Sequence, residues 1–108
     1  MRKISMNAVR AFYNKRVFIS PNTRISMDVK GNPQMFLFDN RIAWIKNGTI
    51  WFNFCGWNSV TTRERLRTFG IDFQCRSYNI YHKGELISIG GDYDSGLCLN
   101  DKPNWLMS

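Results

Sequence analysis

The chain has 108 residues, of which 44% are hydrophobic and 15% are aromatic. This length suits one domain that needs neither a disulfide nor a metal to fold, and the composition excludes an intrinsically disordered chain. Fifteen basic residues against eight acidic ones give a formal net charge of +7, which favours an anionic partner such as nucleic acid or an acidic protein surface.

The cysteines and the N-terminus predict the compartment. Cys55, Cys75 and Cys98 form no CxxC pair, and their odd number leaves at least one thiol unpaired. The opening MRKISMNAV lacks the apolar run of a secretory signal, and no stretch approaches the roughly 20 apolar residues that cross a membrane. We therefore expect a cytoplasmic protein that makes no membrane contact.

The first predicted element is a helix from Met6 to about Lys15. Ser5 is placed to act as its N-cap. Val9 and Phe12 lie on its apolar side and Arg10 on another, so this helix is expected to pack on the core through one face.

The period then changes from helix to strand. Apolar and polar residues alternate from Thr23 to Val29, which predicts a strand with one solvated face, and the wholly apolar run Met35–Phe38 predicts a second strand. A strong hairpin signal follows at Asn47-Gly48, because both central positions of a type I′ turn need positive φ.

That hairpin joins IAWIK to TIWFNF. A two-residue turn between them places Lys46 opposite Thr49 and Trp44 opposite Trp51. We therefore predict a cross-strand pair of tryptophans.

A second helix is predicted from about Thr62 to Phe69. Thr61 followed three residues later by Glu64 has the spacing of a capping box, and Gly70 suits a left-handed C-terminal cap. The apolar side chain of Leu66 is expected to face the core.

The rest of the chain indicates more strands. Alternation over 71–76, the strand-like YNIYH, a Lys83-Gly84 turn and ELISI predict two or three strands, and the turn-rich tail of about 90–108 is expected to pack on the body. The prediction is one α+β domain, residues 1–108, with an antiparallel sheet of about five to seven strands and two short helices.

Three segments carry a family resemblance: NTRI from Asn22, FLFDNRIAWI from Phe36, and GWNSVTTRERL from Gly56 to Leu66. Their order and spacing resemble a family of small tailed-bacteriophage proteins with the pattern NT-x-V, GN-x-IA, GW-x-T-x-TT-[KR]-x-RL. Asp39 stands where this pattern has glycine. The resemblance covers roughly residues 1–73 and implies a phage origin and a host-cytoplasm setting, without an activity.

Catalytic and metal signatures are weak. His82 is the only histidine and no nucleophile motif accompanies it, so it is predicted to be a surface turn residue. A Cys₃His zinc site would need closely spaced ligand pairs, whereas these cysteines are about twenty residues apart. DYDSG lacks the glycine register and closing Glu of a calcium loop. We expect no enzyme activity, no cofactor and no metal.

Basic side chains next to aromatic ones remain as the candidate binding residues, a combination that suits phosphate contacts and base stacking. The predicted set is Arg10, Lys15, Arg16, Trp57, Arg63, Arg65 and Arg67.

The first hypothesis is a non-enzymatic phage accessory protein that binds nucleic acid, or a nucleic-acid-handling host complex, in host takeover or anti-defence. The alternative is a protein–protein inhibitor of a host or defence protein. A basic surface joining both helices favours the first, and an exposed Trp or Phe with a mixed-charge rim favours the second.

Overall fold

A computed structural model describes residues 2–107 of the chain. In chain order the elements are α1 (Lys3–Tyr13), β1 (Phe18–Ile19), β2 (Thr23–Met27), β3 (Pro33–Leu37), β4 (Asn40–Lys46), β5 (Thr49–Phe52), α2 (Val60–Thr68), β6 (Phe73–Arg76), β7 (Asn79–His82), β8 (Glu85–Ile87), β9 (Tyr93–Cys98) and α3 (Asn104–Met107). Six strands form a sheet in the order β1-β2-β3-β4-β5-β9, and β6-β7-β8 form a second sheet. All paired strands are antiparallel, which confirms the α+β class.

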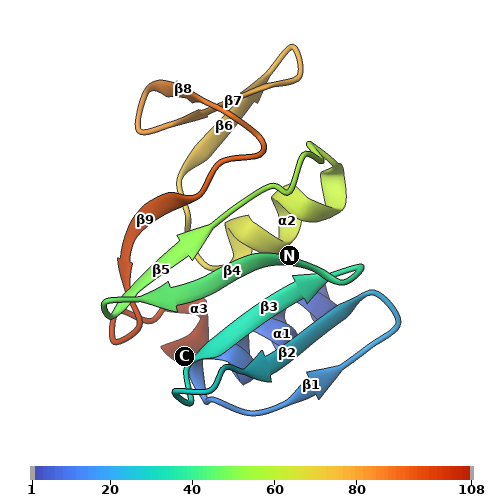
Figure 1. The fold of residues 1–108 in the computed structure, drawn as a ribbon, viewed down its shortest axis with the longest axis vertical. Helices are drawn as coiled ribbons and strands as arrows, with labels where there is room; N and C mark the ends of the chain where they lie inside the picture. Colours follow the sequence, from blue (N-terminus) through green and yellow to red (C-terminus); the bar gives the residue numbers. More distant parts are fainter. Residues whose placement is uncertain (1, 108) are drawn as a thin grey trace.

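The large sheet has helices on one side only. Figure 1 looks onto this sheet, with α1 behind β2 and β3 and α2 beside it, and no helix of residues 2–107 lies in front. The small sheet extends from one end of the molecule, beyond β5. The core between the large sheet and the two helices is built from side chains that are almost fully buried, among them Val9, Phe12, Ile25, Met35, Ile50, Phe52, Leu66 and Phe69. The opposite face of the sheet is left to solvent.

The predicted β4–β5 hairpin is confirmed. Asn47 and Gly48 have φ of 53° and 77°, as a type I′ turn requires. Trp44 pairs with Trp51, and Lys46 with Thr49, in the predicted register.

The C-terminal tail is more ordered than its turn-rich sequence indicates. It contributes β9, which pairs with β5 and forms one edge of the large sheet. Ser95 is buried in this strand and donates a hydrogen bond of 2.5 Å to the carbonyl of Ile50. The partly buried apolar residues of this segment that pack against the core are Leu97, Leu99, Trp105 and Leu106.

Both predicted N-caps are wrong. The first helix begins at Lys3, and Ser5 lies buried within it and donates a hydrogen bond to Glu64 of the second helix. The second helix is capped by Ser59, whose Oγ accepts the N–H of Thr62 at 3.0 Å, and Glu64 faces the first helix. The predicted C-terminal cap is confirmed, since Gly70 has φ of 93° and donates to the carbonyl of Arg67.

The prediction for His82 is also wrong. This residue ends β7, only 7% exposed, and its ring lies edge-on against Phe52 with centroids 5.1 Å apart. Its two ring nitrogens lie 2.8 Å and 3.2 Å from the carbonyl oxygens of Asp72 and Asp94. His82 therefore ties the small sheet to β9.

We predict that Asn47→Pro destabilises the fold by more than about 1 kcal/mol, because proline cannot adopt the positive φ of this turn. Asn47→Gly, which accepts that φ, is the control and should stay within about 0.5 kcal/mol of the wild type. Thermal unfolding followed by circular dichroism measures both. An unchanged melting temperature for the proline variant would show that this turn does not contribute to the stability of the fold.

Candidate functional site

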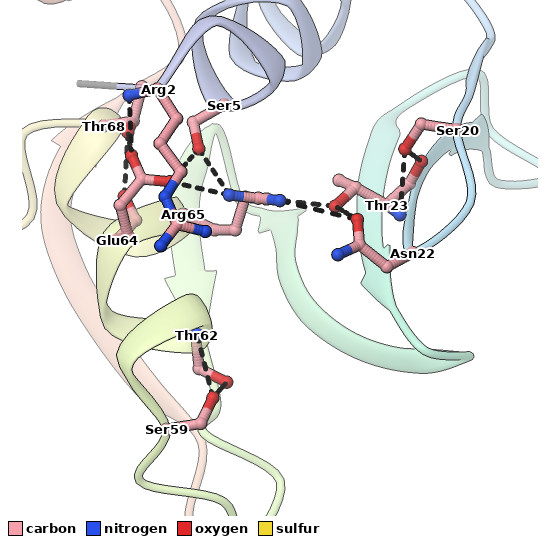
Figure 2. A network of polar contacts seen from close by, with 10 residues as sticks. All are labelled: Arg2, Ser5, Ser20, Asn22, Thr23, Ser59, Thr62, Glu64, Arg65 and Thr68. Atoms are coloured by element: carbon pink, nitrogen blue, oxygen red, sulfur yellow. Dashed lines mark hydrogen bonds and ion pairs between the residues drawn. The ribbon is translucent and has the colours of Figure 1, made fainter.

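The position of α2 is fixed by a buried arginine. Arg65 is only 1% exposed, and its guanidinium reaches from α2 towards α1 and the start of β2 (Figure 2). It donates to Ser5 Oγ at 2.7 Å, to Thr23 Oγ1 at 3.0 Å, to Asn22 Oδ1 at 3.4 Å and to Glu64 Oε1 at 2.6 Å. A buried cation requires this many partners, so the network joins α1, α2 and β2 firmly.

Glu64 is the counter-charge of this network. Its carboxylate also accepts hydrogen bonds from Ser5 Oγ, from the backbone N–H of Arg2 and from Thr68 Oγ1. Burial alone would raise the pKa of Glu64, but these bonds and the charge of Arg65 outweigh burial, and the pKa lies below its usual value. The carboxylate is therefore ionised at neutral pH and holds the guanidinium in place.

A cavity of about 440 Å³ opens beside the first turn of α2. The turn between β3 and β4 forms one wall, and the segment from β5 into α2 forms the other. We name it the aromatic cleft, and its lining residues are Leu37, Phe38, Asn40, Ile42, Phe54, Cys55, Trp57, Ser59, Thr61 and Thr62. The volume falls within the range of sites that take a small molecule or side chains of a partner.

The floor of the aromatic cleft is apolar and its rim is aromatic. Leu37, Ile42 and Phe54 are buried at its base, whereas Phe38 and Trp57 at the rim are 63% and 66% exposed. None of the ten lining side chains carries a formal charge at neutral pH, and hydroxyl and amide groups supply the polar contacts. Such a lining favours an apolar guest over a charged one.

Cys55 is the titratable group in the lining. Burial and the charge of Asp92 raise the pKa of its thiol, although Arg41 acts in the opposite direction. The thiol is therefore protonated at neutral pH and is a poor nucleophile. Its Sγ donates to the carbonyl of Arg41 at 3.2 Å, which ties this wall of the cleft to β4.

Both rim aromatics project from turns with unusual backbone. Phe38 and Asp39 have φ of 48° and 66° and form the two-residue turn between the paired residues Leu37 and Asn40. A bulky side chain is strained at positive φ, at a cost of about 1–3 kcal/mol per residue. The chain thus keeps a phenylalanine in a position that is both strained and exposed.

The opposite rim repeats this feature. Cys55 and Gly56 have φ of 56° and 78°, and Trp57 follows them. The side chain of Asn53 accepts the N–H of Cys55 at 2.6 Å, which closes this turn. Two tight turns therefore hold one exposed aromatic side chain on each side of the cleft.

Charged side chains of both signs lie next to the two rim aromatics. Next to Phe38, Asp39 forms an exposed ion pair of 3.2 Å with Arg24. Near Trp57, Arg63 donates to the carbonyl of Asn58 and to its side-chain oxygen, at 3.1 Å and 2.6 Å. This arrangement is the one expected of a protein-binding patch.

The predicted arginines of α2 do not form one surface. The expectation that Arg65 is accessible is wrong, because the network described above buries its guanidinium. Arg67 is exposed and lies over the ring of Phe73 at 4.6 Å, and Arg63 is turned towards Asn58. Binding by Arg63 and Arg67 stays a prediction.

The predicted residues of the first helix lie in its last turn and just after it. Lys15 and Arg16 are exposed just after the end of α1. Arg10 lies over the ring of Trp105 at 5.7 Å, and the indole of Trp105 donates to the carbonyl of Thr68 at the end of α2. Trp105 thus lies between Arg10 and α2.

Trp57 is the predicted residue that the structure places at the cleft, and Phe38 is the one that sequence reasoning missed. The sequence FLFDN predicts a strand through Phe38, because nothing in it marks a phenylalanine as a turn residue. A possible signal was Asp39, which stands where the family pattern has glycine and adopts a positive φ.

The three cysteines Cys55, Cys75 and Cys98 are free thiols. Within residues 2–107, no three side chains of His, Cys, Asp or Glu come together as a metal site would need. Over the same residues, no helix has the length and hydropathy to cross a membrane.

The sequence profile of one family, described as Kyanoviridae Gp96 protein, matches residues 1–99. This match spans most of the chain and confirms the bacteriophage family that the three segments indicate. No curated protein and no solved structure matches the chain.

We predict that Glu64→Gln lowers the free energy of unfolding by about 3 kcal/mol at neutral pH, because buried Arg65 then lacks its counter-charge. Folding lowers the pKa of Glu64, so its contribution is complete above the unfolded value of about 4.3 and is lost as the pH falls through the lower folded value. The difference from the wild type should therefore narrow below about pH 4.

Urea unfolding between pH 3 and pH 8 measures this effect. The exposed Glu85→Gln provides a control with the same change of charge and should show little difference at any pH. A Glu64→Gln difference that does not change with pH would mean that the carboxylate contributes through packing alone.

Proposed function

We propose that this chain, which belongs to the Kyanoviridae Gp96 protein family, is a non-enzymatic phage accessory protein that docks on a host or defence protein through the aromatic cleft. It acts in the host cytoplasm, in host takeover or anti-defence. The partner presents an apolar side chain from an acidic surface, since the cleft is apolar and the chain carries a formal charge of +7.

One observation carries this proposal. Phe38 and Trp57 remain exposed on opposite rims of an apolar cavity, and strained turns hold both in place. Asparagine or glycine at position 38 would remove strain and exposed apolar surface together. A residue that costs stability in two ways is explained by a contact with a partner, and aromatic side chains beside a pocket are typical binding hot spots.

The mixed charges around the rim support a protein partner over nucleic acid at this site. An ion pair, Arg24–Asp39, borders Phe38, and Arg63 lies on the side of Trp57. A nucleic-acid site would favour an excess of one sign along the groove. Of the basic side chains predicted on the two helices, Arg65 is buried and cannot contribute to a phosphate-binding surface.

Phe38→Asn tests the proposal directly. Relief of strain should raise the free energy of unfolding by about 1 kcal/mol, because asparagine tolerates positive φ far better than phenylalanine. Partner binding should weaken by about thirtyfold, the loss expected when a hot-spot residue is removed. Opposite signs for stability and binding would separate a functional residue from a structural one.

The partner is sought by capture from host lysate with and without nuclease treatment, and the purified pair is then measured by calorimetry. Trp57→Ser should lose the same partner with little change in stability, whereas Val29→Ser, at an exposed residue outside the cleft lining, is the matched control. Capture that persists in both cleft variants, or that disappears after nuclease treatment, would overturn the proposal.

A further inference from the structure

The uncovered face of the large sheet carries aromatic rings with a cation over each. Arg24 lies over Phe36 at 4.5 Å, Arg41 over Trp44 at 4.4 Å, and Lys46 over Trp51 at 4.6 Å. We name these six residues the cation–aromatic ladder. None of them was predicted as a binding residue, although basic side chains beside aromatics were the pattern sought.

Strand register brings the six residues onto one face. Arg24 pairs with Phe36, Phe36 with Arg41, and Trp44 with Trp51, and residues directly opposite each other share a face of the sheet. The register shift between β3 and β4 keeps Arg41 and Trp44 on the same side despite their odd spacing. The ladder therefore runs without a break from β2 to β5, a width of about 14 Å at the usual strand spacing.

We propose that the cation–aromatic ladder binds single-stranded nucleic acid. Phosphates would contact the three cations, and bases would stack on the partly exposed rings of Phe36 and Trp51 in place of the cations that lie over them. Cations and aromatic rings together suit a single strand, since every base has a face that can stack and every nucleotide carries a negative charge. This site is distinct from the aromatic cleft and does not depend on the proposed function.

The cation–ring contacts of the ladder can be replaced by base–ring contacts. A cation over a ring at an exposed position is held weakly, so a base can displace it while the charge moves a short distance to a phosphate. Trp44 is almost fully buried beneath Arg41 and its neighbours, whereas Phe36 and Trp51 are partly exposed. We therefore assign stacking to the latter two and a supporting role to Trp44.

Acidic groups mark the limits of this surface. Asp39 pairs with Arg24 at 3.2 Å on one side, and Asp94 lies opposite Trp51 on the other. The exposed Arg24–Asp39 pair is weak and can open when a phosphate approaches. Phosphates are therefore expected to gather over Arg41 and Lys46, between the two carboxylates.

Single strands are favoured over a duplex for a structural reason. In a duplex the bases are stacked on each other and their faces are hidden, so the rings of the ladder have nothing to contact. A flat face with aromatic side chains suits unstacked bases instead. Oligothymidylate should bind more tightly than the matching duplex of the same length.

The test measures fluorescence anisotropy with fluorescein-labelled oligothymidylate of about twelve nucleotides, within the usual site size of such proteins. The ladder variant Arg24→Ala/Arg41→Ala/Lys46→Ala is compared with Lys15→Ala/Arg16→Ala/Arg67→Ala. Each variant removes three of the fifteen basic side chains, and the second removes only residues predicted at the helices. Comparison of the two variants thus distinguishes binding at the sheet face from binding at the helices and from an effect of net charge.

We expect the ladder variant to raise Kd at least tenfold and to reduce the slope of log K against log salt by about two, since each phosphate contact on a single strand contributes about 0.7. The helix variant should change Kd less than threefold. Trp51→Leu should weaken binding by about tenfold through lost stacking, and Trp51→Phe should retain most of it. Thermal melting of each variant checks the fold.

Three results would overturn the proposal: no binding of oligothymidylate by the wild type, equal losses in the two triple variants, or tighter binding of the duplex. The Trp51→Leu variant keeps Phe38, Trp57 and the Arg24–Asp39 pair at the rim of the cleft, so its capture of a protein partner should be unaffected. Failure of the ladder and failure of the cleft are therefore distinguishable.

Discussion

The fold depends on the requirement that buried Arg65 be neutralised. Removing a guanidinium from water is costly unless a counter-charge and hydrogen-bond acceptors surround it. Here Glu64 supplies the charge, and Ser5, Asn22 and Thr23 supply acceptors from α1 and the start of β2. Two of the segments that carry the family resemblance, NT and RL, meet in this network. The occurrence of NT and RL in the family pattern thus has a structural explanation.

Local rules predicted the local parts of the fold. Asn47-Gly48 specifies its own turn and so fixes the register of Trp44 and Trp51, and Gly70 ends its helix as expected. Long-range requirements were beyond such rules. Ser5 has the form of an N-cap in sequence, but a partner 59 residues away decides its role. In the same way β9 follows no strong alternation, because β5 supplies its pairing.

The sequence predicted the residue types of the candidate surfaces but not their positions on the fold. Composition indicated basic and aromatic side chains together, and Trp57, which was among the predicted residues, lines the aromatic cleft. Whether an arginine faces solvent or the interior depends on packing, which is why Arg65 was misplaced. The ladder needed the register of four strands, including the shift at β3–β4, before its side chains could be seen on one face. Phenylalanine is unusual in a turn at positive φ, so residue propensities predicted a strand at Phe38.

The position of β9 at one edge of the sheet has a consequence for biosynthesis. Its residues pair with β5 across more than forty positions of the chain, as in the pair formed by Phe52 and Tyr93. Such contacts form slowly because a long loop must close before they are gained. During translation, β1 to β5 can pair while β5 still has a free edge, and unpaired strand edges promote association between chains. The nascent protein is therefore most prone to aggregation in the interval before its last strand leaves the ribosome.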